Sequence, residues 1–310
     1  MSTIKVEDVA YVRFSAPDLD AMETFLTEFG LVRAGRTDTA LYMRGTGPEP
    51  YAHVTQKGEP RFVGVAFRAG SIVDLEKLAK AEGRDVAPLD GPGGGKVVVV
   101  TDPDGHRLEI VAGRQEAAAI PVAHEFPTND SFFYPRQNNP KRVGQGPSRV
   151  KRLGHLVLGV GDFARAADWW RARFGFIPSD QWPEENPRGA FLRCDRGAMP
   201  VDHHTVGLVQ GAVRFGHAAF EVVDFDDLMR GSEHLRAKSR QHEWGVGRHF
   251  LGSQIFDYWA DPWGHIVEHW TDGDLMDADW GTRKVSPEIV RAVQWGMEAP
   301  ARPRETPAQQ

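Results

Sequence analysis

An internal duplication is the feature that most constrains how this 310-residue chain folds. Three stretches recur in the same order in both halves, and the offset between the copies grows only from 144 to 153 to 159 residues. Self-similarity of this kind indicates that one structural unit has been repeated. The matched pairs are residues 10–14 with 154–158, residues 62–67 with 215–220, and residues 102–109 with 261–268.

The pattern within each copy predicts a strand, a helix and then several strands. Apolar runs such as residues 156–158 are typical of strands, and an Asp-Pro-x-Gly turn precedes the last strand of each copy. The periodicity of residues 163–174 predicts an amphipathic helix. One face of that helix carries Phe163, Ala166, Ala167, Trp170 and Phe174. Because strands dominate, we expect an α+β fold with largely antiparallel pairing.

Composition marks the boundaries of the two copies. Residues 113–152 are rich in Pro, Gly and Asn, which predicts a connecting segment without regular structure. The tail from about Asp272 contains a predicted helix at 287–297 and then Pro300, Pro303 and Pro307, where we expect fraying. These features predict an N-terminal domain at 1–115, a linker at 116–150, a C-terminal domain at 151–275 and a tail at 276–310.

The two copies differ at three matched positions. The first copy has Tyr11, Gly64 and Glu109, and the second has His155, His217 and Glu268. Two histidines and one carboxylate on three strands are the expected ligands of a non-haem Fe(II) site with open coordination positions. Structural zinc sites typically use several cysteine thiolates, and this sequence has only one cysteine. The comparison therefore predicts a metal site in the second copy and a metal-free first copy.

The alternative is that His155 and His217 are ordinary core histidines. Glu268 argues against this alternative. It lies in an otherwise apolar strand, and a buried carboxylate without a partner is costly, so Glu268 needs a partner such as a metal ion. Glu109 lies in the same sequence context in the metal-free copy, so another group must satisfy its charge.

Overall composition excludes several classes of function. A net charge of −6 and a pI near 6.1 argue against a nucleic-acid partner. No apolar stretch reaches about 18 residues, so we expect no membrane association. The single cysteine, Cys194, excludes a disulfide framework and fits a reducing, cytoplasmic compartment, and we expect it to be a small core residue.

The second half resembles the type I extradiol ring-cleaving dioxygenases, which are catechol 2,3-dioxygenase-like members of the vicinal oxygen chelate superfamily that also includes glyoxalases and bleomycin resistance proteins. The close resemblance covers about 115 residues, and the two-copy plan extends it to the whole chain. It rests on an ordered set of motifs: Gly-His155-Leu-Val, Asp-His-His204, His217-x-x-Phe-Glu221, Gly-Arg-His249, Tyr258-x-x-Asp261-Pro262-x-Gly264 and Glu268.

The resemblance implies tandem βαβββ modules that curl around a cleft in each domain, with iron only in the C-terminal cleft. It implies that Fe(II), or Mn(II), is bound by His155, His217 and Glu268. It further implies that His204 is the acid/base and that His249 and Tyr258 contact the substrate oxygens. The implied reaction is extradiol cleavage of a catechol-type diol by O2 in aromatic degradation, in a homo-oligomer. Some relatives have an acid where this chain has Gly252, which predicts a different polar network.

Elementary chemistry supports the roles of these residues. A catechol must lose a proton to chelate a metal, and an imidazole can accept one near neutral pH. His203 and His204 would point to opposite sides of a strand, so we expect only His204 to face the site. Aromatic residues that could line the pocket are Trp182, Phe191, Trp244 and Phe250. The other histidines are expected to be structural or on the surface: His53, His106, His124, His234, His242, His265 and His269.

Two rival functions remain at this point. One is another metalloenzyme of the superfamily, such as a glyoxalase-like isomerase or a thiol transferase, whose sites typically draw ligands from two paired modules. The other is a non-catalytic ligand-binding protein, which has no need of the predicted metal ligands.

Overall fold

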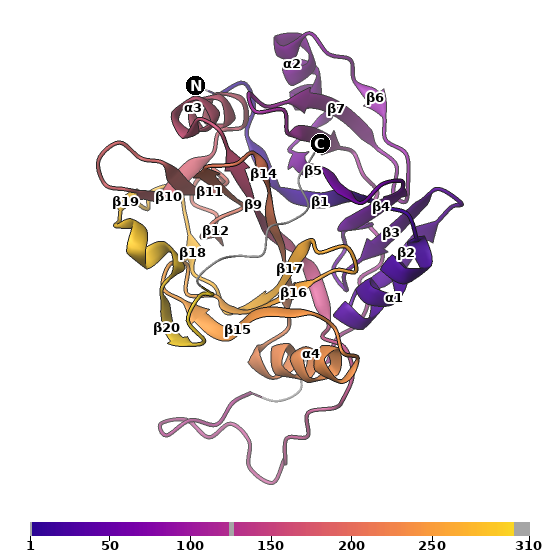
Figure 1. Cartoon of the computed structure of the whole chain (residues 1–310), viewed down its shortest axis with the longest axis vertical. Coiled ribbons are helices and arrows are strands. Elements are labelled where there is room, and N and C mark those ends of the chain that lie inside the picture. Colours follow the sequence, from indigo (N-terminus) through magenta and orange to yellow (C-terminus); the bar gives the residue numbers. More distant parts are fainter. Residues whose placement is uncertain (1, 124–126, 301–310) are drawn as a thin grey trace.

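The computed structural model describes residues 2–123 and 127–300, and it is built around two large curled sheets (Figure 1). The first half contains two strand–helix–three-strand units. The first unit is β1(Val6–Ala16), α1(Leu19–Phe29), β2(Val32–Arg36), β3(Ala40–Arg44) and β4(His53–Lys57). The second is β5(Arg61–Ala69), α2(Ile72–Glu82), β6(Ala87–Pro88), β7(Lys96–Thr101) and β8(Arg107–Ala112).

The second half repeats this plan with a few additions. Its first unit is β9(Val150–Val160), α3(Phe163–Phe174), β10(Ile177–Trp182), β11(Gly189–Arg193), the short β12(Val201–Asp202) and β13(Val206–Gln210). Its second unit is β14(Arg214–Val222), α4(Phe225–Ala237), β15(His242–His249), β16(Ile255–Ala260) and β17(Ile266–Thr271). The chain continues through β18(Leu275–Met276), β19(Arg283–Lys284), a 3-10 helix at Pro287–Arg291 and β20(Val293–Gly296).

Both sheets are assembled in the same way. Within each unit the first strand pairs in parallel with the last, as β9 does with β13 and β14 with β17. The two units of each half then join through their first strands in antiparallel fashion, β1 with β5 and β9 with β14. The resulting orders are β2-β3-β4-β1-β5-β8-β7-β6 and β19-β10-β11-β13-β9-β14-β17-β16-β15-β20. This topology confirms the predicted α+β class with largely antiparallel pairing.

Local sequence explains the helices. Asp18 and Asp162 accept hydrogen bonds from backbone N–H groups in the first turns of α1 and α3. Gly30 and Gly175 end these helices in the left-handed conformation, at φ of 112° and 73°, where a glycine has no Cβ to clash. The predicted helix at 163–174 is confirmed, and its buried side chains are the five that the periodicity selected.

The Asp-Pro-x-Gly turns also have a common structure. Asp102 accepts hydrogen bonds from the backbone N–H groups of Asp104 and His106, and Asp261 does the same for Trp263 and His265. Each turn thereby delivers the chain into the strand that carries the third matched position, which is the acidic residue of each copy.

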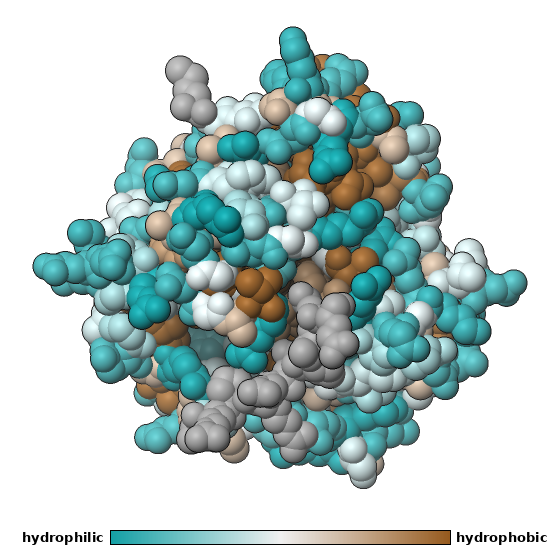
Figure 2. All heavy atoms as spheres, turned by 45° about the horizontal axis from the view of Figure 1, so that its top comes forward, coloured by the Kyte–Doolittle hydropathy of each residue, from teal (hydrophilic) through white to brown (hydrophobic). Residues whose placement is uncertain are grey.

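The larger of the two apolar clusters among the described residues spans both halves. Phe14 of β1 packs edge-on against Phe215 of β14, with ring centroids 5.2 Å apart, and Phe29 of α1 stacks on His269 of β17 at 3.8 Å. Most large apolar side chains are inside, and the face seen in Figure 2 is mainly hydrophilic with scattered apolar patches. The two halves are therefore held in one framework.

Two expectations about the connecting segments have different outcomes. The described part of residues 113–149 contains no helix or strand, as predicted, although β9 already begins at Val150. The helix predicted at 287–297 is wrong. A 3-10 turn ends at Arg291, Ala292 is extended, and β20 pairs with the otherwise unpaired edge of β15, which satisfies its backbone. Pro303 and Pro307 lie outside the described residues.

None of the helices in the described ranges has the length and apolar character needed to cross a membrane.

Candidate active site

Three neighbouring strands bring His155, His217 and Glu268 together. The middle strand is β14, on which Ala219 is the register partner both of His155 on β9 and of Glu268 on β17. Directly paired residues share a face of the sheet, and so do residues two apart on one strand. His217 therefore projects from the same face as the other two side chains, toward the inside of the curl.

The side-chain atoms of these three residues face one centre. The Nε2 atoms of His155 and His217 each lie 3.3 Å from Oε2 of Glu268, and one ligand atom from each residue lies within 4.8 Å of the others. Glu268 is fully buried, yet neither carboxylate oxygen has a hydrogen-bond partner among the described residues, and neither does Nε2 of His217. Unsatisfied buried polar atoms are costly, and a cation between them would satisfy all three residues at once. The residues therefore fit a divalent metal.

Ionisation in this cluster also suits a metal. Burial lowers the pKa of His155, which favours the neutral imidazole with a free lone pair. Burial alone would raise the pKa of Glu268, but contact with the imidazoles of His155 and His217 holds it well below the ordinary value of 4.5. A neutral histidine and an ionised carboxylate are the forms that ligate a metal.

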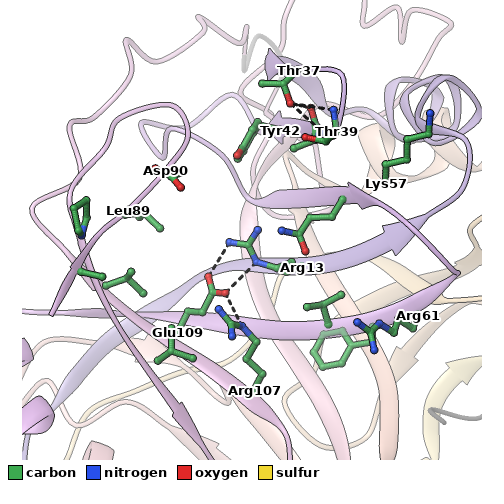
Figure 3. Close-up of a pocket in the computed structure, with 18 of the residues that line it drawn as sticks. Arg13, Thr37, Thr39, Tyr42, Lys57, Arg61, Leu89, Asp90, Arg107 and Glu109 are labelled. Carbon is green, nitrogen blue, oxygen red and sulfur yellow. Dashed lines mark hydrogen bonds and ion pairs between the residues drawn. The ribbon is translucent and has the colours of Figure 1, made fainter. Parts of the chain in front are cut away.

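The matching position of the N-terminal half is organised differently (Figure 3). Tyr11 donates a hydrogen bond to Glu109 Oε2 at 2.5 Å, Arg13 binds both carboxylate oxygens, and Arg107 Nε donates to Oε1 at 2.9 Å. Gly64 supplies no side chain where the other half has His217. The charge of Glu109 is thus satisfied by protein groups, which answers the question that the sequence raised about this carboxylate.

His203 and His204 lie beyond the end of β12, in a bend. Strand alternation therefore does not separate them, contrary to the reason expected, and Nδ1 of His203 is 3.0 Å from Nδ1 of His204. The expectation that only His204 faces the site agrees with the lining of the cavity described below, which includes His204 and not His203. His203 Nε2 lies 2.6 Å from Oδ2 of Asp180, and Arg283 donates to both oxygens of that carboxylate. The order of contacts is therefore Arg283, Asp180, His203 and His204.

This chain of contacts determines the tautomer of His204. The Asp180 carboxylate only accepts, so Nε2 of His203 donates to it, and Nδ1 of neutral His203 is an acceptor. His204 must then donate from Nδ1, which leaves its Nε2 with a lone pair. The His204 ring lies 4.1 Å from the ring of His155 and 4.3 Å from that of Phe191, measured between centroids.

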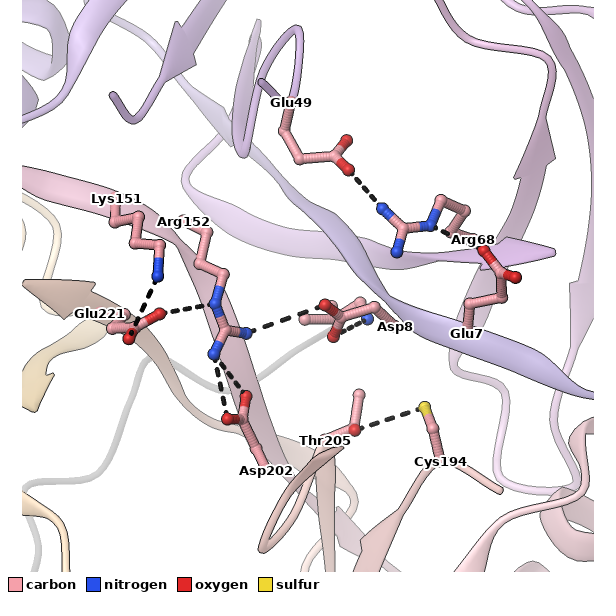
Figure 4. A network of polar contacts seen from close by, with 11 residues as sticks. Glu7, Asp8, Glu49, Arg68, Lys151, Arg152, Cys194, Asp202, Thr205 and Glu221 are labelled. Carbon is pink, nitrogen blue, oxygen red and sulfur yellow. Dashed lines mark hydrogen bonds and ion pairs between the residues drawn. The ribbon is translucent and has the colours of Figure 1, made fainter. Parts of the chain in front are cut away.

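A network of charges holds the segment that precedes these histidines (Figure 4). Arg152 of β9 donates to Asp202, the residue before His203, and to Glu221 of β14, at 2.8 and 2.6 Å. Its third partner is Asp8 of β1 at 3.7 Å, so the network also ties the two halves together.

His249 and Tyr258 form the opposite side of the site. Tyr258 is paired with Glu268 in the register of β16 and β17, which places it beside the carboxylate. His249, the last residue of β15, has Nε2 at 2.9 Å from the Tyr258 hydroxyl and 3.7 Å from Glu268 Oε1. Burial raises the pKa of Tyr258 well above 10, so its hydroxyl keeps its proton.

Five of these side chains line a cavity of 370 Å³: His155, His204, His217, His249 and Tyr258. Apart from the histidines and Tyr258 its walls are largely apolar, and Val290, Arg291 and Pro300 of the C-terminal segment contribute to them. Its aromatic walls include Trp182, Phe191 and Trp244, as anticipated, whereas Phe250 is outside the cavity and 49% exposed.

No sequence motif pointed to Asp180, to Arg283 or to the contribution of the C-terminal segment. Gly252 (φ 76°) lies against the same relay, because a Cβ there would come within 3.0 Å of Nδ1 of His203.

The remaining histidines are mostly internal. His53, His106, His265 and His269 are buried, and His106 Nε2 bonds the carbonyl of Gly159 across the interface between the halves. His242 contacts Asp257 at 2.7 Å, and His234 is half-buried on α4. His124 lies outside the described residues. Cys194 is buried, as expected of a core residue.

Comparisons with known proteins place this geometry in context. Metapyrocatechase 2 of Cupriavidus necator is 26% identical over 314 residues, with 95% of this chain and 90% of that protein covered. Biphenyl-2,3-diol 1,2-dioxygenase of Sphingomonas paucimobilis is 22% identical, with 91% and 90% covered.

Solved structures share the fold. A Mn(II)-bound glyoxalase from Novosphingobium aromaticivorans has a TM-score of 0.79 at 24% identity and covers 98% of this chain and 97% of its own. Homoprotocatechuate 2,3-dioxygenase from Brevibacterium fuscum, in complex with 3,4-dihydroxyphenylacetate, has a TM-score of 0.78 at 19% identity and covers 96% and 91%. The expected fold of tandem βαβββ modules is thereby confirmed. The model of the Glyoxalase/Bleomycin resistance protein/Dioxygenase superfamily matches residues 152–269 of this chain, which contain all three residues of the candidate metal site.

Proposed function

We propose that the protein is an extradiol dioxygenase, which opens the ring of a catechol-type diol with O2 beside the two hydroxyl groups. We assign His155, His217 and Glu268 as ligands of Fe(II), a set that Mn(II) also accepts. Both sequence relatives over the whole chain are named dioxygenases, which supports the reaction class. We call His155, His217 and Glu268 the triad. The observation that carries the proposal is that His204, His249 and Tyr258 line the same largely apolar cavity as the two histidines of the triad.

The metal, when bound, acts as a Lewis acid and template for the two oxygens of the diol and for O2. The protein supplies the rest. His204 is the acid/base: its relay to Asp180 keeps the Nε2 lone pair available, so it can accept a proton within the site and later return it. His203 and Asp180 then stabilise the charged ring that results.

His249 and Tyr258 bind the oxygens of the substrate. The Tyr258 hydroxyl keeps its proton and donates, while His249 lies within reach of both that hydroxyl and Glu268. Trp182, Phe191 and Trp244 give the aromatic ring apolar walls that exclude water. Holding the reactants in one orientation makes their reaction effectively intramolecular.

The origin of the three ligands does not argue against a glyoxalase-like isomerase. Each half already contains two paired units: His155 comes from the first unit of the C-terminal half, and His217 and Glu268 come from the second. Ligands from paired modules therefore do not separate a glyoxalase-like isomerase from a dioxygenase. What favours the dioxygenase is the set of acid/base and donor groups around the triad, together with the names of the sequence relatives. A ligand-binding protein has no use for the three ligands.

Anaerobic reconstitution with Fe(II), followed by O2 uptake with a panel of catechols, tests the proposal. We expect uptake and a yellow ring-opened product, both abolished in His217→Ala. His234→Ala, on α4 and outside the cavity, is the matched control and should retain activity. Stoichiometric iron without O2 uptake from any diol, together with isomerisation of a hemithioacetal, would instead establish the rival.

A further inference from the structure

The N-terminal half encloses a second and larger cleft. The cavity measures 1110 Å³ and is lined by β1 and β3 to β8, the same face of the curled sheet that forms the candidate active site in the other half (Figure 3). It contains no metal-ligand cluster like that of the C-terminal half, among residues 2–123 and 127–300. What this cavity can bind therefore depends on the side chains that line it.

Matched positions show how the two clefts diverged. Arg13 occupies the position of Val157, and Arg107 occupies that of Ile266; both apolar residues line the C-terminal cavity. Two apolar wall residues of one cleft thus correspond to guanidinium groups in the other. We call the N-terminal cavity the basic cleft and define it by Arg13, Lys57, Arg61 and Arg107.

The positive charge of the basic cleft exceeds what its acids neutralise. Its lining holds four basic side chains and two acidic ones, Asp90 and Glu109, in a chain with a net charge of −6. Glu109 takes a hydrogen bond from Arg107 through Nε alone, and from Arg13 through Nε and Nη2. Lys57 and Arg61 have no ion pair within the described ranges. Arg13 and Arg107 share the single carboxylate of Glu109, so some of their N–H groups remain free to bind a ligand in the cavity. Lys57 and Arg61 add two cations without an ion pair in the described part of the chain.

Burial makes part of this charge effective. The Arg13 side chain is only 11% exposed, and Glu109, Arg107 and Tyr11 hold the charged residues of this wall in fixed positions. Glu109 also holds Arg107, which is 45% exposed and uses only Nε in that contact, so this guanidinium is positioned for a carboxylate or phosphate in the cavity. Arg61 and Lys57 line the same cavity and lie to the right of Arg13 and Arg107 in Figure 3.

We propose that the basic cleft is a second ligand site, which binds a small anion through its carboxylate or phosphate groups. The ligand contacts Arg107, Arg61 and Lys57, and the Arg13–Glu109 pair forms the floor. This site does not depend on the ring-cleavage function proposed for the other cleft.

Isothermal titration calorimetry on the full, metal-loaded chain tests the proposal, with citrate and inorganic phosphate as probes and glycerol as the neutral control. We expect saturable binding of at least one anion, weakened by about tenfold in Arg107→Gln and in Lys57→Gln/Arg61→Gln, since each removes charge-assisted contacts. Citrate alone would indicate a carboxylate ligand, and phosphate alone a phosphorylated one. These variants should fold, because Lys57, Arg61 and Arg107 are exposed and Glu109 retains Arg13.

A charge-matched control is Lys80→Gln/Arg171→Gln, which removes two exposed cations on α2 and α3, outside the basic cleft. His217→Ala separates binding here from anion binding to a metal in the other cleft. Affinity lost only in the basic-cleft variants supports the site. No saturable binding of either anion at millimolar concentration, or equal loss in the control pair, or loss in His217→Ala alone, would overturn it.

Discussion

Nδ1 of His203 lies 3.0 Å from Nδ1 of His204, and this contact fixes which nitrogen of His204 faces the cavity with a lone pair. Nε2 of His203 is committed to Asp180, which Arg283 holds from the other side. Two residues that would have been on opposite sides of a strand instead form a relay, because the strand ends at Asp202.

Asp180→Asn is predicted to lower kcat by about 10- to 100-fold while metal content stays near that of the wild type, because the amide no longer enforces donation from His203. Arg283→Gln leaves the His203–Asp180 contact in place and should have the smaller effect. Metal analysis and steady-state O2 uptake measure the two quantities. Equal kcat in Asp180→Asn and wild type would show that the relay has no role in turnover.

The triad predicts that a divalent metal stabilises the fold. Mn(II) at 100 times its dissociation constant should raise the free energy of unfolding by about 2.7 kcal/mol. His217→Ala, which removes a half-buried ligand, should show no such increase, and His234→Ala should behave as the wild type. Thermal unfolding with and without Mn(II) provides the measurement, and an undiminished rise in His217→Ala would contradict the ligand assignment.

Glu109 should become destabilising when Arg13 is replaced. Arg13→Met is expected to cost about 2 to 3 kcal/mol, since it removes two charge-assisted hydrogen bonds from a carboxylate that is 3% exposed, while Tyr11 and Arg107 still bind it. The double variant Arg13→Met/Glu109→Met should recover most of that loss, because no buried charge remains unpaired. Urea unfolding of the single and double variants gives the values. Losses that simply add would show that the pair is not coupled.

Protonation of His53 is expected to cause part of the loss of stability in acid. It is 2% exposed at the interface between the halves, and burial lowers its pKa to about 3 from an ordinary 6.5. Between these values the unfolded chain binds a proton that the folded protein does not, so stability is complete above 6.5 and falls as the pH drops toward 3. His53→Gln should flatten the dependence of the melting temperature on pH in this window.

The comparison is best made on chelator-treated protein, so that loss of metal in acid does not contribute. Burial also lowers the pKa of His234, which is half-buried on α4, so His234→Gln should flatten the dependence as well but by less than His53→Gln does. An unchanged slope in His53→Gln would exclude His53 as a source of the acid sensitivity.

The sequence was informative wherever the two copies could be compared. The triad, the α3 face and the Asp-Pro-x-Gly turns all follow from matched positions or from local periodicity. Asp180, Arg283 and β20 were missed because non-local strand pairing creates their contacts: β19 brings Arg283 beside Asp180, and β15 recruits β20. No local pattern records which distant strand will occupy a sheet edge.

The same limit explains the other errors. The helix predicted at 287–297 satisfied local propensity, but the free edge of β15 offered its backbone better partners. The side chains that neutralise Glu109 could not be named from the comparison of ligand positions, because Arg13 and Arg107 lie two residues from the matched positions of Tyr11 and Glu109.

Labelling with 18O2 tests the central claim most directly. Fe(II)-loaded protein should consume O2 and a catechol in equal amounts, and mass spectrometry of the ring-opened product should show both labelled oxygen atoms. His204→Phe, which keeps a ring against Phe191, should bind iron but turn over slowly. A protein that holds iron at His155, His217 and Glu268 and yet places no labelled oxygen in any diol product would contradict ring cleavage.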